Sequence, residues 1–182
     1  ILGSHNEQWG TGQDRFGKAR LIDSIEKQIN RPVEHFEPPQ NASEQQLRDT
    51  TKKFLNAYQD ADPGATGIFN GHSGPNAMWF TNGELGSHIP NRADDPRTVQ
   101  VDTFAQMFED RFLQYKKQYE NQPDQWNDVL AQLNTDVFVL HGCFSFNFMQ
   151  TVAKKLEGTG YRPIFVATAE YNQPAYSQSS AL

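Results

Sequence analysis

Residues 135–146 read Thr135-Asp-Val-Phe-Val-Leu-His-Gly-Cys-Phe-Ser-Phe146, and this stretch decides the expected fold. Residues 137–140 are bulky and uncharged, which is typical of a strand covered on both faces in the middle of an α/β sheet. The strand ends near Gly142, and Cys143, the only cysteine of the chain, follows directly. Open α/β sheets place their sites beyond the carboxyl ends of their strands, so Cys143 is a candidate functional residue. A buried core thiol is the alternative, because free cysteines are often buried.

Strand-like and helix-like segments alternate along the rest of the chain. The spacing of apolar residues predicts helices that begin near Asp14, Ser43 and Asn147, and a longer helical region that is broken near Pro123. Ser43 with Gln46 three residues later matches a capping box. The expected parallel strands cover residues 1–4, 32–37, 65–70, 136–142 and 163–169. This order predicts an α/β three-layer sandwich, in which helices flank a mainly parallel sheet.

Length and charge limit the class of protein. The 182 residues fit one domain, and we expect a fragment of a larger protein because the chain opens on Ile1 rather than on Met. A net charge of −6 argues against nucleic acid as the main partner. No apolar run approaches the roughly 20 residues that span a bilayer, so no membrane partner is expected.

A histidine follows a second predicted strand. Residues 66–70 lead into Gly71-His-Ser-Gly-Pro75. Because parallel strands end at the same edge of a sheet, we expect His72 and Cys143 to share one cleft. A thiolate attacks an acyl carbon, an imidazole transfers protons, and backbone N–H groups stabilise the oxyanion. A turn histidine bonded only to backbone is the alternative for His72.

These motifs resemble those of the caspase–legumain–gingipain superfamily of cysteine peptidases. In that superfamily one apolar strand ends in His-Gly and a later one ends in Ala-Cys or Gly-Cys. Here the two motifs are Gly67-Ile-Phe-Asn-Gly-His72-Ser-Gly and Val137-Phe-Val-Leu-His-Gly-Cys143. Further similar stretches are Leu2-Gly-Ser with Asp14-Arg15, the segment 77–85, and residues 164–177. The resemblance implies a single caspase-like peptidase domain over residues 1–182, with a small hairpin of residues 77–83 after the histidine.

The resemblance also implies roles for individual residues. Cys143 would be the nucleophile and His72 the acid and base. The backbone N–H groups of Ser73, Gly74 and Cys143 would form the oxyanion hole, although family members usually have Gly directly after the histidine. The substrate pocket would be formed by Arg15, His141, Ala169, Glu170 and Tyr171. Arg15 favours Asp or Asn before the scissile bond, whereas an inward Glu170 would let a basic side chain compete.

The expected function is therefore a cysteine endopeptidase that acts on protein or peptide substrates in regulatory or self-processing proteolysis. We expect no cofactor, and no metal because the five histidines are scattered without ligand spacing to Cys143. The oligomeric state does not follow from the sequence. By analogy we expect a cytoplasmic location, which includes a bacterial effector or toxin domain acting in a host cytosol.

Three other functions remain open. Residues 71–75 nearly match the nucleophile elbow Gly-x-Ser-x-Gly, which would make Ser73 the nucleophile of a serine hydrolase, although an elbow leads directly into a helix. A caspase-like fold that has lost catalysis would serve as an interaction module. A flavodoxin-like binder of small molecules is the third, and its Gly-rich phosphate loop is missing from the sequence.

Overall fold

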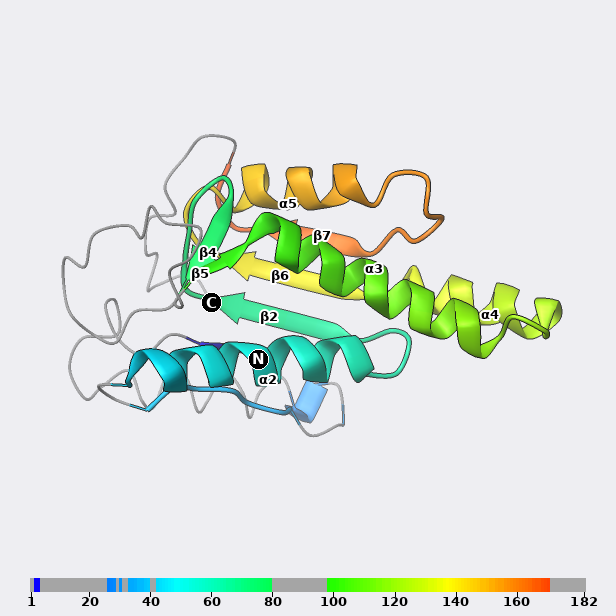
Figure 1. Ribbon diagram of the computed structural model, residues 1–182, viewed down its shortest axis with the longest axis horizontal. Helices are drawn as coiled ribbons and strands as arrows, with labels where there is room; N and C mark the ends of the chain where they lie inside the picture. The colour runs from blue at the N-terminus through cyan, green and yellow to red at the C-terminus, as the bar shows by residue number, and fades with distance from the viewer. Residues whose placement is uncertain are drawn as a thin grey trace.

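The computed structural model describes residues 2–3, 26–28, 30, 33–39, 42–79 and 98–170. Its centre is a four-stranded sheet, and all neighbouring strands in it are parallel. The order across the sheet is β1 (Leu2–Gly3), β2 (Thr66–Asn70), β6 (Val137–His141) and β7 (Ile164–Ala167). The arrows of β2 and β6 end at the same edge (Figure 1). The expected α/β class with a mainly parallel sheet is confirmed.

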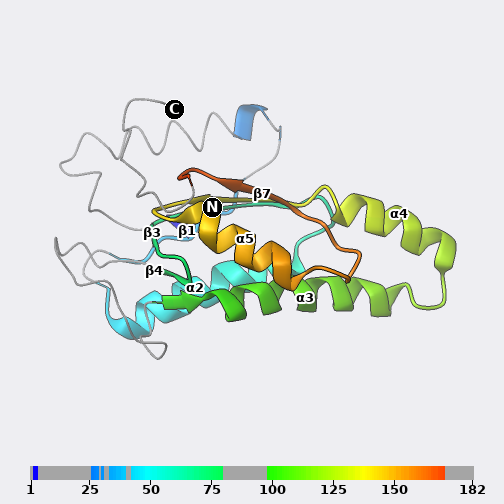
Figure 2. The ribbon, with the colours of Figure 1, turned by 90° about the horizontal axis from the view of Figure 1, so that it is seen from above.

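Helices cover one face of this sheet (Figures 1 and 2). These are α2 (Glu44–Asp60), α3 (Val101–Gln118) and α5 (Ser145–Lys155), while α4 (Pro123–Leu133) lies near the end where the strands begin. Side chains of β6 alternate between the two faces, and Phe138 and Leu140 are fully buried on the helical side. Phe138 makes edge-to-face contacts with four aromatic rings of α2 and α3, at centroid separations of 4.7 to 5.9 Å. The core therefore lies between these helices and the sheet.

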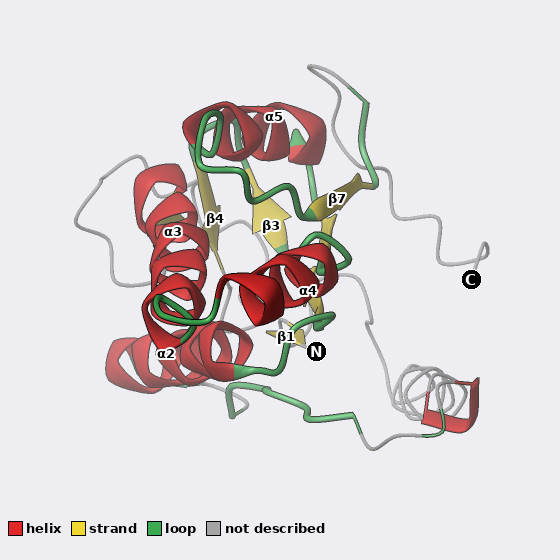
Figure 3. Ribbon diagram, turned by 90° about the vertical axis from the view of Figure 1, so that its right-hand side faces the viewer, coloured by secondary structure: helices red, strands yellow, loops and turns green. Residues whose placement is uncertain are grey.

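The opposite face of the sheet is more open among the described residues. It carries Val137, Val139 and His141 of β6, which are half-buried. Beside them on β7, Ile164 and Val166 are 50% and 41% exposed. The helical residues 26–28 lie on this side of the sheet (Figures 2 and 3). This arrangement is compatible with a three-layer sandwich.

A small antiparallel sheet follows β2. It consists of β3 (His72–Ser73), β4 (Ala77–Trp79) and β5 (Thr98–Gln100), with β4 in the middle. The expected hairpin of residues 77–83 is described only over β4, which pairs instead with β3 around residues 74–76. Its expected turn at 82–83 lies outside the described residues, and the sequence had not indicated β5 as the other partner of β4.

Two local expectations are wrong. The strand expected at 32–37 is absent from the described residues 33–37, where only Phe36 forms an isolated bridge. Prolines on both sides restrict this segment and remove backbone donors, and Phe36 packs instead on Phe54 of α2 at a ring separation of 5.8 Å. Helix α5 begins at Ser145 rather than at Asn147, directly after a left-handed residue, Phe144, with φ 52°.

Other local expectations are confirmed. The Ser43 side chain accepts a hydrogen bond from the Gln46 amide, and the Gln46 side chain accepts one from the Ser43 amide, which completes the capping box. The long helical region is divided into α3 and α4, and Pro123 is the first residue of α4. Proline is favoured there because the first helical N–H has no intrahelical partner.

Candidate active site

The ends of β2 and β6 bring the two candidate catalytic positions to one edge. Asn70 and His141 are register partners at the last position of each strand. The Gly71 amide donates to the His141 carbonyl at 3.0 Å, which extends the pairing by one residue. His72 and Cys143 each come two residues after the register partners, so their backbones lie at the same edge of the sheet. The structure describes the backbone of His72, and its side chain lies outside the described part.

A direct hydrogen bond joins the two turns. The Ser73 hydroxyl donates to the backbone carbonyl of Cys143, and the Ser73 side chain is only 2% exposed. Gly142 lies against this contact, because a Cβ placed there would come within 2.8 Å of the Gly71 carbonyl oxygen and would also collide with the Ser73 hydroxyl. Glycine at 142 is therefore required by the close approach of the two turns.

The two backbone amides after His72 differ in their bonding. Gly74 N–H donates to the Ala77 carbonyl at 2.8 Å, so a role for it in an oxyanion hole requires this bond to break. Antiparallel pairs alternate between hydrogen-bonded and non-bonded partners, which makes the next pair, Ser73 with Met78, a non-bonded one. The Ser73 amide is thus directed away from β4. Of the two, Ser73 is the better candidate oxyanion donor.

Cys143 sits in a tight turn between β6 and α5. Its side chain is half-buried. Phe144 has φ 52° and ψ 22°, a left-handed conformation that costs a non-glycine residue about 1–3 kcal/mol. Such strained residues cluster at functional sites. The turn places Ser145 at the start of α5 with its side chain fully buried.

His141 lies on the more open face of the sheet and is half-buried. Burial lowers the pKa of its imidazole below the ordinary value of 6.5. The neutral form therefore dominates at neutral pH, and a neutral imidazole presents one donor and one acceptor. This chemistry is consistent with a residue that contacts a polar substrate side chain.

The expected substrate pocket is described only in part. Ala169 is 7% exposed and Glu170 is exposed, and both follow the end of β7. Arg15 and Tyr171 lie outside the described residues. Ser145 was not among the site residues predicted from the sequence. Its hydroxyl accepts hydrogen bonds from the amides of Thr168 and Ala169 at 3.0 and 2.8 Å. A serine two residues after the candidate nucleophile was the available signal.

A second polar cluster, also missed, lies where β6 begins. Arg111 of α3 is fully buried and binds Asp136 through two hydrogen bonds of 2.8 and 3.1 Å. Asp136 also accepts bonds from the Gly64 and Ala65 amides and from the Tyr161 hydroxyl, at 2.6 to 2.8 Å. The signal in the sequence was an arginine within the apolar stripe of α3. This cluster links the loop after α2 to α3 and β6, at the end of the strand opposite to Cys143.

The electrostatics of this cluster follow from its burial. Burial by itself would lower the pKa of Arg111, but its hydrogen bond with Asp136 and the carboxylate charge raise it above the ordinary value. Burial, followed by the influence of Tyr58 and Asp136, raises the pKa of Tyr161. The Tyr161 phenol therefore remains protonated and acts as the donor to Asp136. The cluster is saturated with hydrogen bonds and is structural in character.

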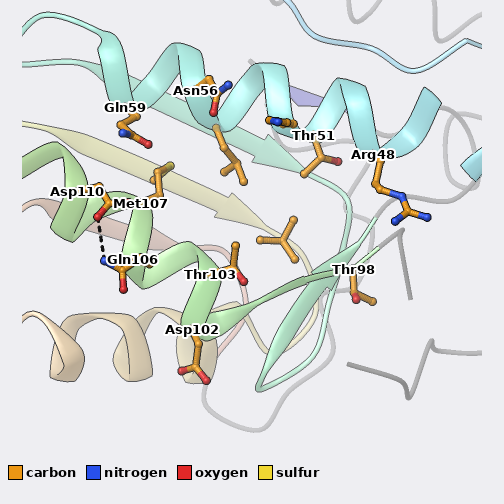
Figure 4. Close-up of a pocket in the computed structure, with 13 residues that line it drawn as sticks. Arg48, Thr51, Asn56, Gln59, Thr98, Asp102, Thr103, Gln106, Met107 and Asp110 are labelled. Carbon is orange, nitrogen blue, oxygen red and sulfur yellow. Dashed lines mark hydrogen bonds between the residues drawn. The ribbon is translucent and has the colours of Figure 1, made fainter. Parts of the chain in front are cut away.

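A groove of about 580 Å³ lies between α2 and α3, with β5 at one end (Figure 4). Arg48 and Lys52 project from α2, while Asp102 and Asp110 project from α3. None of the candidate catalytic or pocket residues lines this groove. It is separate from the Cys143 turn.

The described residues have two further properties. They contain no group of three or more histidine, cysteine or carboxylate side chains arranged to hold a metal ion. No helix in this part of the chain combines the length and the apolar character needed to cross a bilayer.

In comparisons with known proteins, no family model, curated protein or solved structure matches the chain.

Proposed function

We propose that the protein is a cysteine endopeptidase with a caspase-like three-layer fold, in which Cys143 is the nucleophile and His72 the acid and base. The observation that carries the proposal is the register of β2 and β6, which ends in Asn70 opposite His141. A nucleophile and a proton-transfer group are needed at one place, and both motifs follow these two strand ends.

The proposed reaction is the hydrolysis of a peptide bond. The Cys143 thiolate attacks the carbonyl carbon, and the amides of Ser73 and Cys143 stabilise the oxyanion. The C–N bond breaks as His72 protonates the leaving amine, which leaves a thioester on the sulfur. Water then attacks the thioester while His72 accepts its proton. The C–S bond then breaks, which releases the new carboxylic acid and returns the Cys143 thiolate and the protonated His72.

A serine hydrolase mechanism has less support. The Ser73 hydroxyl is almost fully buried and already donates to the Cys143 carbonyl. A nucleophilic serine must be exposed to the substrate and must give its proton to a base. The segment after Ser73 is a hairpin, whereas a nucleophile elbow leads into a helix.

The test is a peptide library combined with a peptide-based electrophilic probe. We expect the wild type to cleave a subset of the library and to form a covalent adduct with the probe at Cys143. Cys143→Ala should abolish both reactions and leave the circular dichroism spectrum and the unfolding midpoint nearly unchanged. Ser73→Ala should still form the adduct.

Two results would contradict the proposal. Inactivation by Ser73→Ala with full activity of Cys143→Ala would support the serine hydrolase. A wild type that cleaves no peptide and forms no adduct would support an inactive interaction module.

A further inference from the structure

We propose that Ser145 is a positioning residue that aligns the substrate-selecting segment 168–170 with the Cys143 turn. The inference rests on the proposed function and deepens it. Ser145 is the first residue of α5, two positions after the candidate nucleophile. Its hydroxyl is fully buried and accepts hydrogen bonds from two successive backbone amides, those of Thr168 and Ala169.

The two bonds form where the chain leaves the sheet. Strand β7 ends at Ala167, and the Thr168 amide also makes a longer bond of 3.3 Å to the carbonyl of Leu140 in β6. The Thr168 hydroxyl approaches the same carbonyl at 3.4 Å. Beyond this point the Ala169 amide binds only Ser145 among the bonds that the structure describes. The direction of the chain at Ala169 therefore depends on Ser145.

The consequence concerns where the following side chains lie. Ala169 is buried, and Glu170 immediately after it is exposed. Both belong to the segment that the resemblance to the caspase–legumain–gingipain superfamily implies as part of the substrate pocket. Because Ser145 follows Cys143 by two residues, its hydroxyl ties this segment to the turn of the nucleophile, beyond the point where Thr168 still bonds to Leu140. Misplacing a reacting group by about 1 Å can lower a rate a hundredfold, so such a link affects substrate selection.

Ser145 differs from the neighbouring hydroxyl residues in the part of the chain that its hydroxyl contacts. The Thr151 hydroxyl on the same helix donates to the Asn147 carbonyl one turn earlier, and within the described part of the chain this is a local contact of α5. Ser73 bonds to Cys143 itself and belongs to the catalytic turn. Ser145 alone among these three connects the turn to the segment after β7. Thr151 is therefore a suitable matched control.

The experiment compares Ser145→Ala with Thr151→Val in the full 182-residue chain. Amide hydrogen exchange is measured at Thr168 and Ala169, and kcat and KM are measured for the best and the second-best library peptide. The rate of Cys143 alkylation by iodoacetamide reports separately on the nucleophile. Ser145→Thr, which keeps the hydroxyl, is included as a rescue variant.

In Ser145→Ala we expect faster hydrogen exchange at both amides. The ratio of kcat/KM for the best peptide to that for the second-best peptide should fall about tenfold, which is the effect of losing one to two hydrogen bonds. The loss should lie mainly in KM, and the alkylation rate should change less than about twofold. Thr151→Val should match the wild type, and Ser145→Thr should restore part of the selectivity.

Failure of this inference is distinguishable from failure of the proposed function. If the wild type cleaves peptides, and Ser145→Ala frees the amides without changing the selectivity, the positioning role is overturned and the peptidase remains. Unchanged amide exchange in Ser145→Ala would also overturn it. If the wild type cleaves no peptide, the proposed function fails and the positioning role fails with it.

Discussion

The hydroxyl of Ser73 donates a hydrogen bond to the carbonyl of Cys143, and the two residues are 70 positions apart in the chain. This bond joins the turn after β2 to the turn after β6. Gly142 lies between the turns with no space for a side chain. The position of Cys143 therefore depends on contacts of its backbone, and single mutations at Ser73 or Gly142 can test these contacts separately.

Gly142→Ala should destabilise the protein and reduce turnover. The added methyl would approach the Gly71 carbonyl oxygen to 2.8 Å and collide with the Ser73 hydroxyl. Overpacking of this kind costs about 1–3 kcal/mol, measured as the free energy of unfolding in urea. Ser73→Ala should relieve only the collision with the hydroxyl, so the double variant should recover part of the loss. Full additivity of the two single effects would contradict the contact.

His72→Ala and His141→Ala should have different kinetic effects. His72 is the proposed proton-transfer group, so its removal should abolish turnover of every peptide. His141 lies on the more open face of the sheet, and its removal should mainly change which side chain is accepted before the scissile bond. Profiles of kcat and KM across the library separate these outcomes. Loss of turnover from His141→Ala alone would reverse the assignment.

Arg15→Ala should weaken a preference for Asp or Asn before the scissile bond. A charge-assisted hydrogen bond is worth about 1.5–3 kcal/mol, which corresponds to roughly ten- to a hundredfold in preference. Glu170→Gln is the matched variant, because it removes the negative charge of the exposed residue after Ala169 that could let a basic substrate side chain compete. The library profile is the measurement. A wild-type preference for Lys or Arg would refute the pocket assignment.

Asp136→Asn should be strongly destabilising. It leaves the buried Arg111 guanidinium without its charged partner, and breaking a buried ion pair costs about 3–5 kcal/mol. Tyr161→Phe removes one bond to the carboxylate and should cost less, about 1.5–3 kcal/mol.

The matched control is Lys155→Met, which breaks the exposed pair with Asp102 and should cost at most about 1 kcal/mol. Urea unfolding measures all three variants. Equal losses in the buried and the exposed pair would contradict the structural role of Asp136.

Acidification should destabilise the protein in part through His141. Burial lowers the pKa of its imidazole in the folded state, so the unfolded chain binds more protons below pH 6.5. The contribution of His141 to stability is complete above pH 6.5 and is lost as the pH falls through the lowered pKa. His141→Gln should therefore show a smaller decrease in unfolding free energy between about pH 7.5 and pH 5. An identical decrease in wild type and variant would remove His141 as the cause.

The sequence by itself determined the local elements and the order in which they occur. Periodicity and turn residues are local signals, so they predicted β2, β6 and β7, the capping box at Ser43 and the break at Pro123. They failed at residues 32–37, where Phe36 forms only an isolated bridge and its ring packs on Phe54 of α2. A short apolar run does not reveal which surface it will contact.

Only the tertiary structure decided which polar groups meet. The Ser73 hydroxyl bonds to the Cys143 carbonyl, 70 residues away in the sequence, and Arg111 binds Asp136, 25 residues away. The Ser145 hydroxyl accepts hydrogen bonds from the amides of residues 168 and 169, which are 23 and 24 residues away. These contacts depend on the register between strands and on the angle at which a helix leaves its turn. Register is set by the packing of whole strands and helices, and a shift of one residue would reverse the face of each side chain. No local pattern carries that information, so the bonding partners of Ser145 and Arg111 are known only from the folded chain.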